Sequence, residues 1–166
     1  DAVDDYVNAG NGESLNIIGN LTISYWLKLN RLYGSNIFNN PYVISKYGSN
    51  SGYFMSSYRS NGQPIFFYSG HSITANTGIV IGNFSYIVAT YDGTNMSIYI
   101  NGVLDKTVVD IFSPVTSENK LLLGKANPPG YVIPGSIDEV RIYNRTLSSS
   151  EIAILYNTSL KSTGNI

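Results

Sequence analysis

Apolar and polar residues alternate in several short segments of the chain. In LTISYWLKL at residues 21–29, Leu21, Ile23, Tyr25, Leu27 and Leu29 fall on one face and Thr22, Ser24, Trp26 and Lys28 on the other. Because successive side chains of a strand point to opposite faces, this segment is predicted to be a half-buried strand. Turn-forming clusters separate further predicted strands at residues 41–47, 51–58 and 64–70.

The second half of the chain carries the clearest hairpin signals. Strands are predicted at 84–91, 96–100 and 103–109, with a turn at 92–95 and the pair Asn101-Gly102 between the last two. Asn and Gly both tolerate positive φ, so this pair between alternating segments predicts a tight hairpin turn. Segments 120–124 and 136–143 complete about ten predicted strands.

Within residues 135–156, a predicted strand is followed by the start of a predicted helix. Ser148 is the predicted N-cap, Glu151 three residues later completes a capping box, and Leu147 is placed to contact Ile152 across the cap. Ile152, Leu155 and Tyr156 then form one apolar face of a short helix.

The strand before this helix contains a carboxylate at a position predicted to face the core. Strict alternation places Asp138 with Val140 and Ile142, and Glu139 and Arg141 on the opposite face. An inward carboxylate is costly unless a cation or backbone N–H groups compensate it. We therefore expect either a bound cation or a cluster of amides beside Asp138.

These elements predict an all-β fold, a two-sheet antiparallel β-sandwich or jelly roll with one short helix near the C-terminus. One domain is expected over residues 1–157, followed by a polar tail or linker at 158–166. The chain begins with residues that already resemble a strand, and we interpret it as a domain of a longer protein.

Composition narrows the partners. Ten Lys and Arg balance eleven Asp and Glu, so the chain has no basic surplus for a nucleic-acid backbone and no charge run or apolar run suited to membrane insertion. The absence of cysteine excludes disulfides, thiolate metal sites and cysteine nucleophiles.

Three segments together resemble a known family. They are VDDYVNAGNGESLNIIGNLTISYWLKL at 3–29, SYIVATYDGTNMSIYINGVLDKTV at 85–108 and GSIDEVRIYNRTLSSSEIAILY at 135–156. In this order they resemble laminin-G-like, concanavalin A-like jelly-roll domains. The resemblance implies two curved antiparallel sheets, a frequent structural calcium, and a ligand surface on the concave sheet or its rim loops. It also implies a secreted or cell-surface modular protein.

Calcium is the first candidate cofactor, because hard cations take several oxygen ligands. Asp138 is the first predicted ligand. In a fold of the resembled family, Asp4 and Asp5 would lie on the neighbouring N-terminal strand and are further candidates. The alternative is that Asp138 only accepts backbone N–H groups.

Glycan binding is the second hypothesis, because sugars stack on exposed aromatic rings while amides and charged groups take their hydroxyls. The candidate aromatics and their polar neighbours are Tyr53, Tyr58, Arg59, Asn61, Tyr68, His71, Tyr91 and Tyr99. Tyr99 is predicted to face outward, opposite Met96, Ile98 and Ile100. Trp26 is either a further platform or is covered by a loop or helix.

Other function classes have less support. A glycoside hydrolase needs two carboxylates across the scissile bond, and Asp138 and Glu139, being adjacent, are predicted on opposite faces. His71 beside Ser72 lacks an identifiable orienting acid and is interpreted as a loop histidine. The sequence therefore favours a non-catalytic carbohydrate-binding module. The first alternative is a structural or adhesive module that binds a protein or a neighbouring domain, and the second is a glycoside hydrolase-related domain with a carboxylate pair drawn from separate strands.

Overall fold

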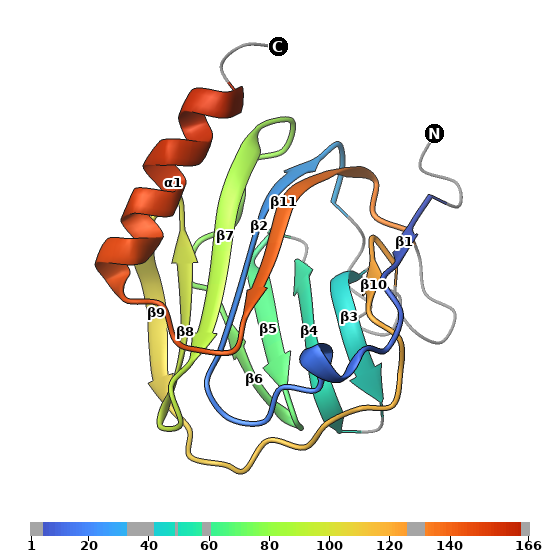
Figure 1. Cartoon of the computed structure of the whole chain (residues 1–166). Helices are drawn as coiled ribbons and strands as arrows, with labels where there is room; N and C mark the ends of the chain where they lie inside the picture. Colours follow the sequence, from blue (N-terminus) through green and yellow to red (C-terminus); the bar gives the residue numbers. More distant parts are fainter. Residues whose placement is uncertain (1–4, 33–41, 49, 58–60, 126–131, 164–166) are drawn as a thin grey trace.

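A computed structural model describes residues 5–32, 42–48, 50–57, 61–125 and 132–163 as two antiparallel sheets and a helix (Figure 1). The six-stranded sheet has the order β1-β10-β3-β4-β5-β6 and the five-stranded sheet β11-β2-β7-β8-β9. The six-stranded sheet comprises β1 (Val7–Asn8), β10 (Leu122–Leu123), β3 (Tyr42–Gly48), β4 (Ser51–Ser57), β5 (Pro64–Tyr68) and β6 (His71–Thr74). The five-stranded sheet comprises β11 (Gly135–Tyr143), β2 (Leu21–Leu29), β7 (Phe84–Tyr91), β8 (Asn95–Ile100) and β9 (Val103–Val109).

The predicted all-β sandwich is confirmed, and its strands lie close to the predicted segments. The clearest difference is β6, which begins at His71 in a stretch predicted to be a loop. A short 3₁₀ helix, η1 (Glu13–Leu15), precedes β2. The helix α1 (Ser149–Thr163) runs beyond residue 157 into the segment predicted to be a polar tail or linker.

The main core lies between the two sheets and follows the predicted alternation of β2. Leu21, Ile23, Tyr25, Leu27 and Leu29 are all fully buried against inward residues of the six-stranded sheet. The opposite face of β2 is buried too, which differs from the half-buried strand predicted. A second layer must therefore cover the outside of the five-stranded sheet.

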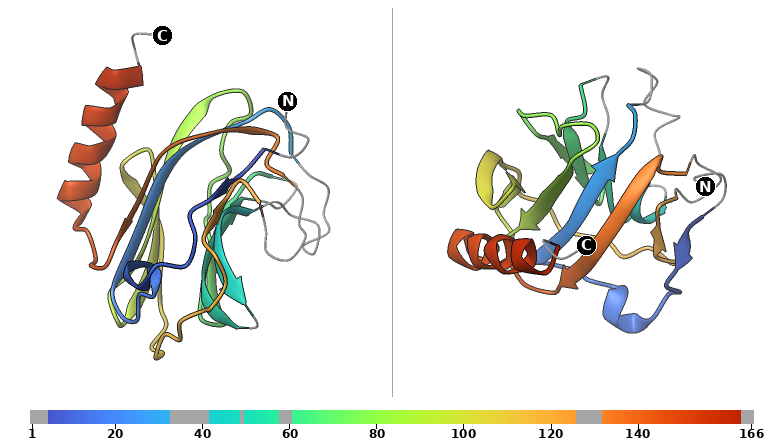
Figure 2. Two further views of the ribbon diagram at one scale, coloured as in Figure 1. Left: turned by 45° about the vertical axis from the view of Figure 1, so that its right-hand side comes forward. Right: turned by 90° about the horizontal axis from the view of Figure 1, so that it is seen from above.

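That layer is α1, which lies along the outer face of the five-stranded sheet (Figure 2). Trp26, Tyr86 and Val88 of the sheet form a second apolar cluster with Leu147 and Ile152. The predicted apolar helix face is confirmed, since Leu155 and Tyr156 pack on the same cluster. The Tyr156 ring stacks on Trp26 with centroids 5.7 Å apart.

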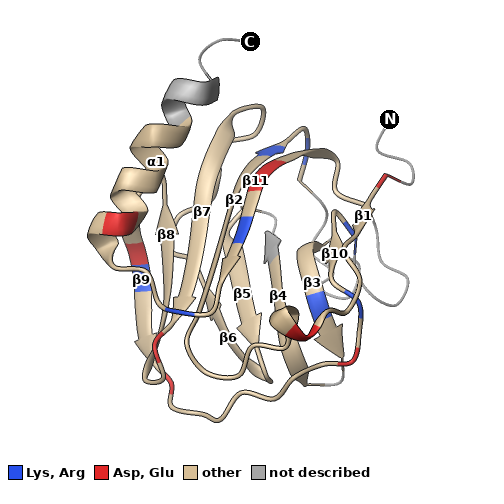
Figure 3. Ribbon diagram, in the orientation of Figure 1, with Lys and Arg blue, Asp and Glu red and all other residues tan. Residues whose placement is uncertain are grey.

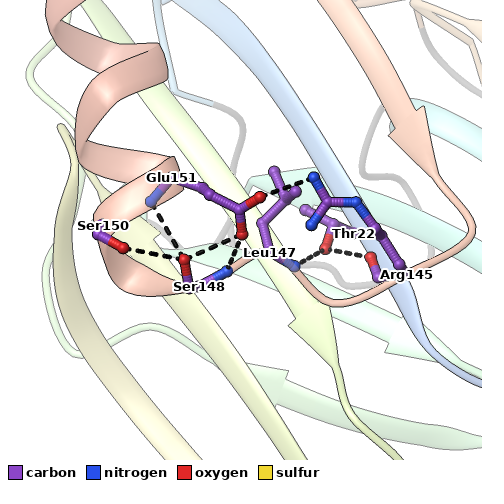
Figure 4. A network of polar contacts seen from close by, with 6 residues as sticks. All are labelled: Thr22, Arg145, Leu147, Ser148, Ser150 and Glu151. Atoms are coloured by element: carbon purple, nitrogen blue, oxygen red, sulfur yellow. Dashed lines mark hydrogen bonds and ion pairs between the residues drawn. The ribbon is translucent and has the colours of Figure 1, made fainter.

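The start of α1 is the predicted capping box (Figure 4). The Glu151 carboxylate accepts the Ser148 N–H at 2.8 Å, and the Ser148 hydroxyl accepts the Glu151 N–H at 3.3 Å. The N–H of Leu147 donates to the Thr22 hydroxyl at 3.0 Å, which ties the cap to β2. These bonds satisfy donors that a helix start otherwise leaves open.

The predicted Asn101-Gly102 hairpin turn is also confirmed, with φ of 53° and 79° at the two residues. A Cβ added to Gly102 would lie 3.1 Å from a ring carbon of Tyr156. Glycine is therefore required here both by the backbone conformation and by the helix that crosses the turn.

Candidate functional site

A cleft of about 540 Å³ opens where one edge of the six-stranded sheet faces one edge of the five-stranded sheet. Its walls come from β1 and the residues before it, from the end of β10, and from β11. These segments lie far apart in the sequence but side by side in the fold (Figures 1 and 2). The lining residues are Asp5, Tyr6, Val7, Leu123, Gly124, Val132, Ile133, Gly135, Ile137, Asp138, Glu139 and Val140.

Tyr6 supplies an aromatic surface at this cleft. Its side chain is 48% exposed, although a ring of this size gains from burial. The ammonium of Lys125 lies 4.4 Å from the ring centroid, a distance suited to a cation–π contact. The lysine therefore contacts one face of a ring that lines the cleft.

Gly124 lines the cleft beside the segment before β1. Its φ is +84°, and an added Cβ would lie 3.5 Å from the backbone oxygen of Asp5 and 3.8 Å from Ile137. These are ordinary van der Waals distances, so the left-handed backbone conformation, and not a lack of space, favours glycine here.

A β-bulge in β11 sets the direction of the cleft carboxylates. Asp138 pairs with Trp26 and Arg141 with Ser24, so two residues, Glu139 and Val140, oppose one residue of β2. Glu139 has a φ of 48°, a conformation that the first residue of such a bulge usually achieves as glycine. The extra residue shifts the alternation by one.

This shift makes the predicted inward orientation of Asp138 wrong. Ile137, Val140 and Ile142 pack on the core, whereas Asp138 is exposed. The Asp138 carboxylate accepts the N–H of Glu139 at 2.7 Å. The predicted need for a cation to neutralise a buried carboxylate therefore disappears.

Glu139 is oriented by Arg141. A guanidinium nitrogen of Arg141 donates to its carboxylate at 2.9 Å, and the two side chains are 39% and 23% exposed respectively. Since the pair is partly exposed, its worth to stability is modest, but it restricts the Glu139 side chain at the cleft. The bulge and this ion pair together present oxygen acceptors on one wall.

Comparison with known proteins assigns the chain to a family. A family model described as the concanavalin A-like lectin/glucanases superfamily matches residues 1–153. The chain belongs to this superfamily. No curated protein matches it.

Solved structures of concanavalin A-like domains share the fold at low sequence identity. The binding domain of Paraclostridial Mosquitocidal Protein 1 aligns with a TM-score of 0.70 and 18% identity over 93% of this chain and 41% of that one. The binding domain of Botulinum neurotoxin DC, solved in complex with rat synaptotagmin II, aligns with a TM-score of 0.67 and 21% identity. The alignment covers 92% of this chain and 40% of that one. Domain 4 of AbnA, an extracellular arabinanase from Geobacillus stearothermophilus, was solved with arabinotriose and aligns with a TM-score of 0.64 and 20% identity. The alignment covers 84% of this chain and 68% of that one. This chain thus spans about two fifths of each toxin binding domain.

Three of the tyrosines predicted to bind ligand belong instead to the core of this concanavalin A-like domain. Tyr53 is 1% exposed, and Tyr68 and Tyr91 are fully buried. Burial raises the pKa of Tyr68 to about 12 and also raises that of Tyr53. Rings without exposed faces cannot stack on a sugar, so these three assignments are wrong.

Tyr99 and Trp26 are covered by the helix. Tyr99 does lie on the outer side of its sheet, as predicted, but it is only 8% exposed and its hydroxyl lies 3.3 Å from that of Ser149. Trp26 is 3% exposed beneath Tyr156. The interpretation of Trp26 as covered by a helix is therefore confirmed.

Among the other predicted ligand-binding residues that the structure describes, Asn61 and His71 do not line the cleft. Tyr58, Arg59 and Asp4 lie outside the described residues, and Asn61 is an exposed turn residue. His71 lies on β6, where it stacks on Phe112 at 4.0 Å and bonds the Asp110 carboxylate at 2.9 Å. Of the predicted metal ligands, Asp138 and Asp5 both line the cleft.

Outward aromatic rings exist on the six-stranded sheet, but they were not singled out from the sequence. Phe54 and Phe67 stack 4.6 Å apart at 9°, and Tyr42 stacks on Phe54 at 4.3 Å and 6°. Because these rings cover each other's faces, the row stabilises neighbouring strands and leaves little aromatic face for a sugar. Tyr6 is the better platform.

The part of the chain that the structure describes contains no helix that is long and apolar enough to cross a membrane. The described residues also contain no group of three or more His, Cys, Asp or Glu side chains arranged to hold a metal ion.

Proposed function

We propose that this domain is a non-catalytic glycan-binding module and that its ligand occupies the cleft between β1 and β11. The observation that carries the proposal is the exposed ring of Tyr6 in the same cleft as the carboxylates of Asp5 and Asp138. We also propose that the module acts outside the cell, as expected for a domain that meets polysaccharides.

The chemistry of the cleft suits a sugar. One face of a sugar ring is lined with C–H groups and stacks on an aromatic face, while its hydroxyls donate to carboxylates. Tyr6 would supply the stacking surface, and Asp138 the acceptor. The AbnA domain solved with arabinotriose supports the idea that this fold accommodates an oligosaccharide.

The state of the cleft carboxylates supports binding over hydrolysis. A glycosidase needs one carboxyl that donates a proton and a second that attacks or activates water. Here Glu139 is held by Arg141, and Asp138 accepts a backbone N–H. Both carboxylates accept hydrogen bonds within the domain, an arrangement that suits the recognition of hydroxyl groups.

Calcium is a second component of the proposal. Asp5 and Asp138 both line the cleft and would be the described residues that hold the ion, in which case the ion, and not Asp138, would meet the sugar hydroxyls. Two carboxylates supply only part of the six to eight oxygens that calcium prefers, so backbone oxygens or water would complete the shell. A melting temperature that is identical in calcium and in chelator would refute this component.

The function is tested by screening the domain on a glycan array and measuring the best ligand by calorimetry. Tyr6→Ala is expected to weaken binding about tenfold or more, because the stacking face is lost. Phe84→Ala is the matched control: Phe84 is 43% exposed, also has a lysine over its ring, and does not line the cleft.

A folded domain that binds no glycan would refute the proposal. That result would favour the alternative of a protein-binding module, for which the toxin domain in complex with synaptotagmin II offers a precedent in this fold.

A further inference from the structure

The charged side chains that line the cleft are acidic. Among the described residues that line it, the charged ones are Asp5, Asp138 and Glu139, and none is Lys, Arg or His. Figure 3 shows acidic residues on β11 and in the segment before β1. The chain as a whole is nearly neutral, so this local surplus is a property of the site and not of the composition.

Two of the described cations near the cleft contact residues that line it. Lys125 lies over the ring of Tyr6 at 4.4 Å, and Arg141 bonds the Glu139 carboxylate at 2.9 Å, so part of the cleft's negative charge is compensated. Asp138, in contrast, is exposed, and a carboxylate that accepts one N–H retains further lone pairs for ligand donors.

We infer that the cleft selects glycans that lack acidic groups, an inference that rests on the proposed glycan-binding function. Carboxylates accept hydrogen bonds but cannot donate them, so sugar hydroxyls complement this wall. A sugar carboxylate, sulfate or phosphate at the same place would face like charges in a partly desolvated cleft. Repulsion between like charges lowers the affinity for an acidic glycan more than the carboxylates raise the affinity for a neutral one.

Glu139 lines the cleft as well as Asp138. Residues of both faces of β11 reach the cleft, because β11 is the edge strand of its sheet. Glu139 is inferred to be a secondary specificity residue, because its ion pair with Arg141 offsets part of its repulsion toward anions while Asp138 has no such pair among the described contacts.

The test uses pairs of oligosaccharides that differ only in an acidic group. Galactose oligosaccharides are compared with oligogalacturonides of the same linkage, and lactose with sialyllactose, each by calorimetry in chelator so that no cation masks the carboxylates. The neutral member is expected to bind at least about tenfold tighter in each pair that binds. This ratio should shrink in about 1 M NaCl, where the Debye length falls to about 3 Å.

Variants assign the effect to the residues. Asp138→Asn combined with Glu139→Gln should bring the two affinities of a pair to within about threefold, and Glu139→Gln alone should give an intermediate ratio. Glu13→Gln removes an exposed carboxylate that does not line the cleft and should leave the ratio unchanged. Equal melting of the variants confirms that folding is not the cause.

The outcomes separate the two proposals. Acidic sugars that bind as well as or better than their neutral partners would overturn the inference and leave glycan binding intact. The absence of binding to any glycan on the array would overturn both. A ratio that persists unchanged in the double variant would show that shape, and not these carboxylates, sets the preference.

Discussion

The ammonium of Lys46 lies 2.6 Å from the carbonyl oxygen of Ser117, inside the molecule. Lys46 on β3 is 1% exposed and also donates to the carbonyl of Asn119, at 2.9 Å, and to the side chain of Asn11. Burial lowers the pKa of this lysine. The protein thus uses its own side chain as an internal cation that joins β3 to the segment before β10.

We expect Lys46→Met to be destabilising by about 2–3 kcal/mol, because it leaves two backbone carbonyls without their donor. The free energy of unfolding in urea measures this. Lys120→Met, which removes an exposed lysine of the same segment, should change stability by less than about 0.5 kcal/mol. Equal effects of the two variants would contradict the role given to Lys46.

The left-handed backbone conformation of Glu139 predicts that a glycine variant is more stable than an alanine variant at this position, the reverse of the usual order in a strand. Both Glu139→Gly and Glu139→Ala lose the carboxylate, but only glycine adopts a φ of 48° without steric cost. The glycine variant should therefore be more stable by about 1 kcal/mol. At Ser136, an exposed position of the same strand with no positive φ, alanine should be the more stable of the pair. Urea unfolding of the four variants checks both orders.

The cap of α1 predicts an acid-sensitive contribution to stability. Hydrogen bonds from Arg145 and Ser148 lower the pKa of Glu151 from 4.5 to about 2. A carboxyl with a depressed folded-state pKa stabilises the fold above its unfolded pKa and loses this effect as pH falls through the folded value. The contribution should disappear between pH 4.5 and about pH 2.

Thermal melts of wild type and Glu151→Gln across this range test the cap. The difference between the two proteins should be largest near neutral pH and vanish at the acid end. A constant difference would mean that the ionisation of Glu151 does not stabilise the helix start.

The single tryptophan reports on the docking of α1. Because Trp26 is 3% exposed beneath Tyr156, its emission should be blue-shifted and poorly quenched by acrylamide. Tyr156→Ala should increase quenching and cost about 2 kcal/mol, since a partly buried ring is lost. Tyr6→Ala should leave the quenching unchanged, because Tyr6 lies at the cleft and not under the helix.

Local signals predicted much of this fold. The Asn101-Gly102 turn and the Ser148 capping box depend on neighbours in sequence, and both are confirmed. The burial of both faces of β2 was not predicted, because it depends on α1, which joins β2 only in three dimensions.

The site was harder to predict because it depends on strand parity. Tyr53 and Tyr68 were chosen for their residue type, yet they face the core, and their neighbours Phe54 and Phe67 face outward. Asp138 was placed on the wrong face because a bulge interrupts the alternation. The apolar spacing of Ile137, Val140 and Ile142, three residues and then two, is the sequence signal that indicates this bulge.

The bulge also means that the regular pairing of β11 with β2 does not need Glu139, although the cleft contains its carboxylate. Without Glu139, the strand would read Ile-Asp-Val-Arg-Ile-Tyr, a regular alternation of core-facing and outward side chains along β2. A deletion of this one residue should therefore be accommodated by the sandwich while it removes one carboxylate from the cleft. Ligand preference in this domain can then change by the gain or loss of a single residue, with the core left as it is.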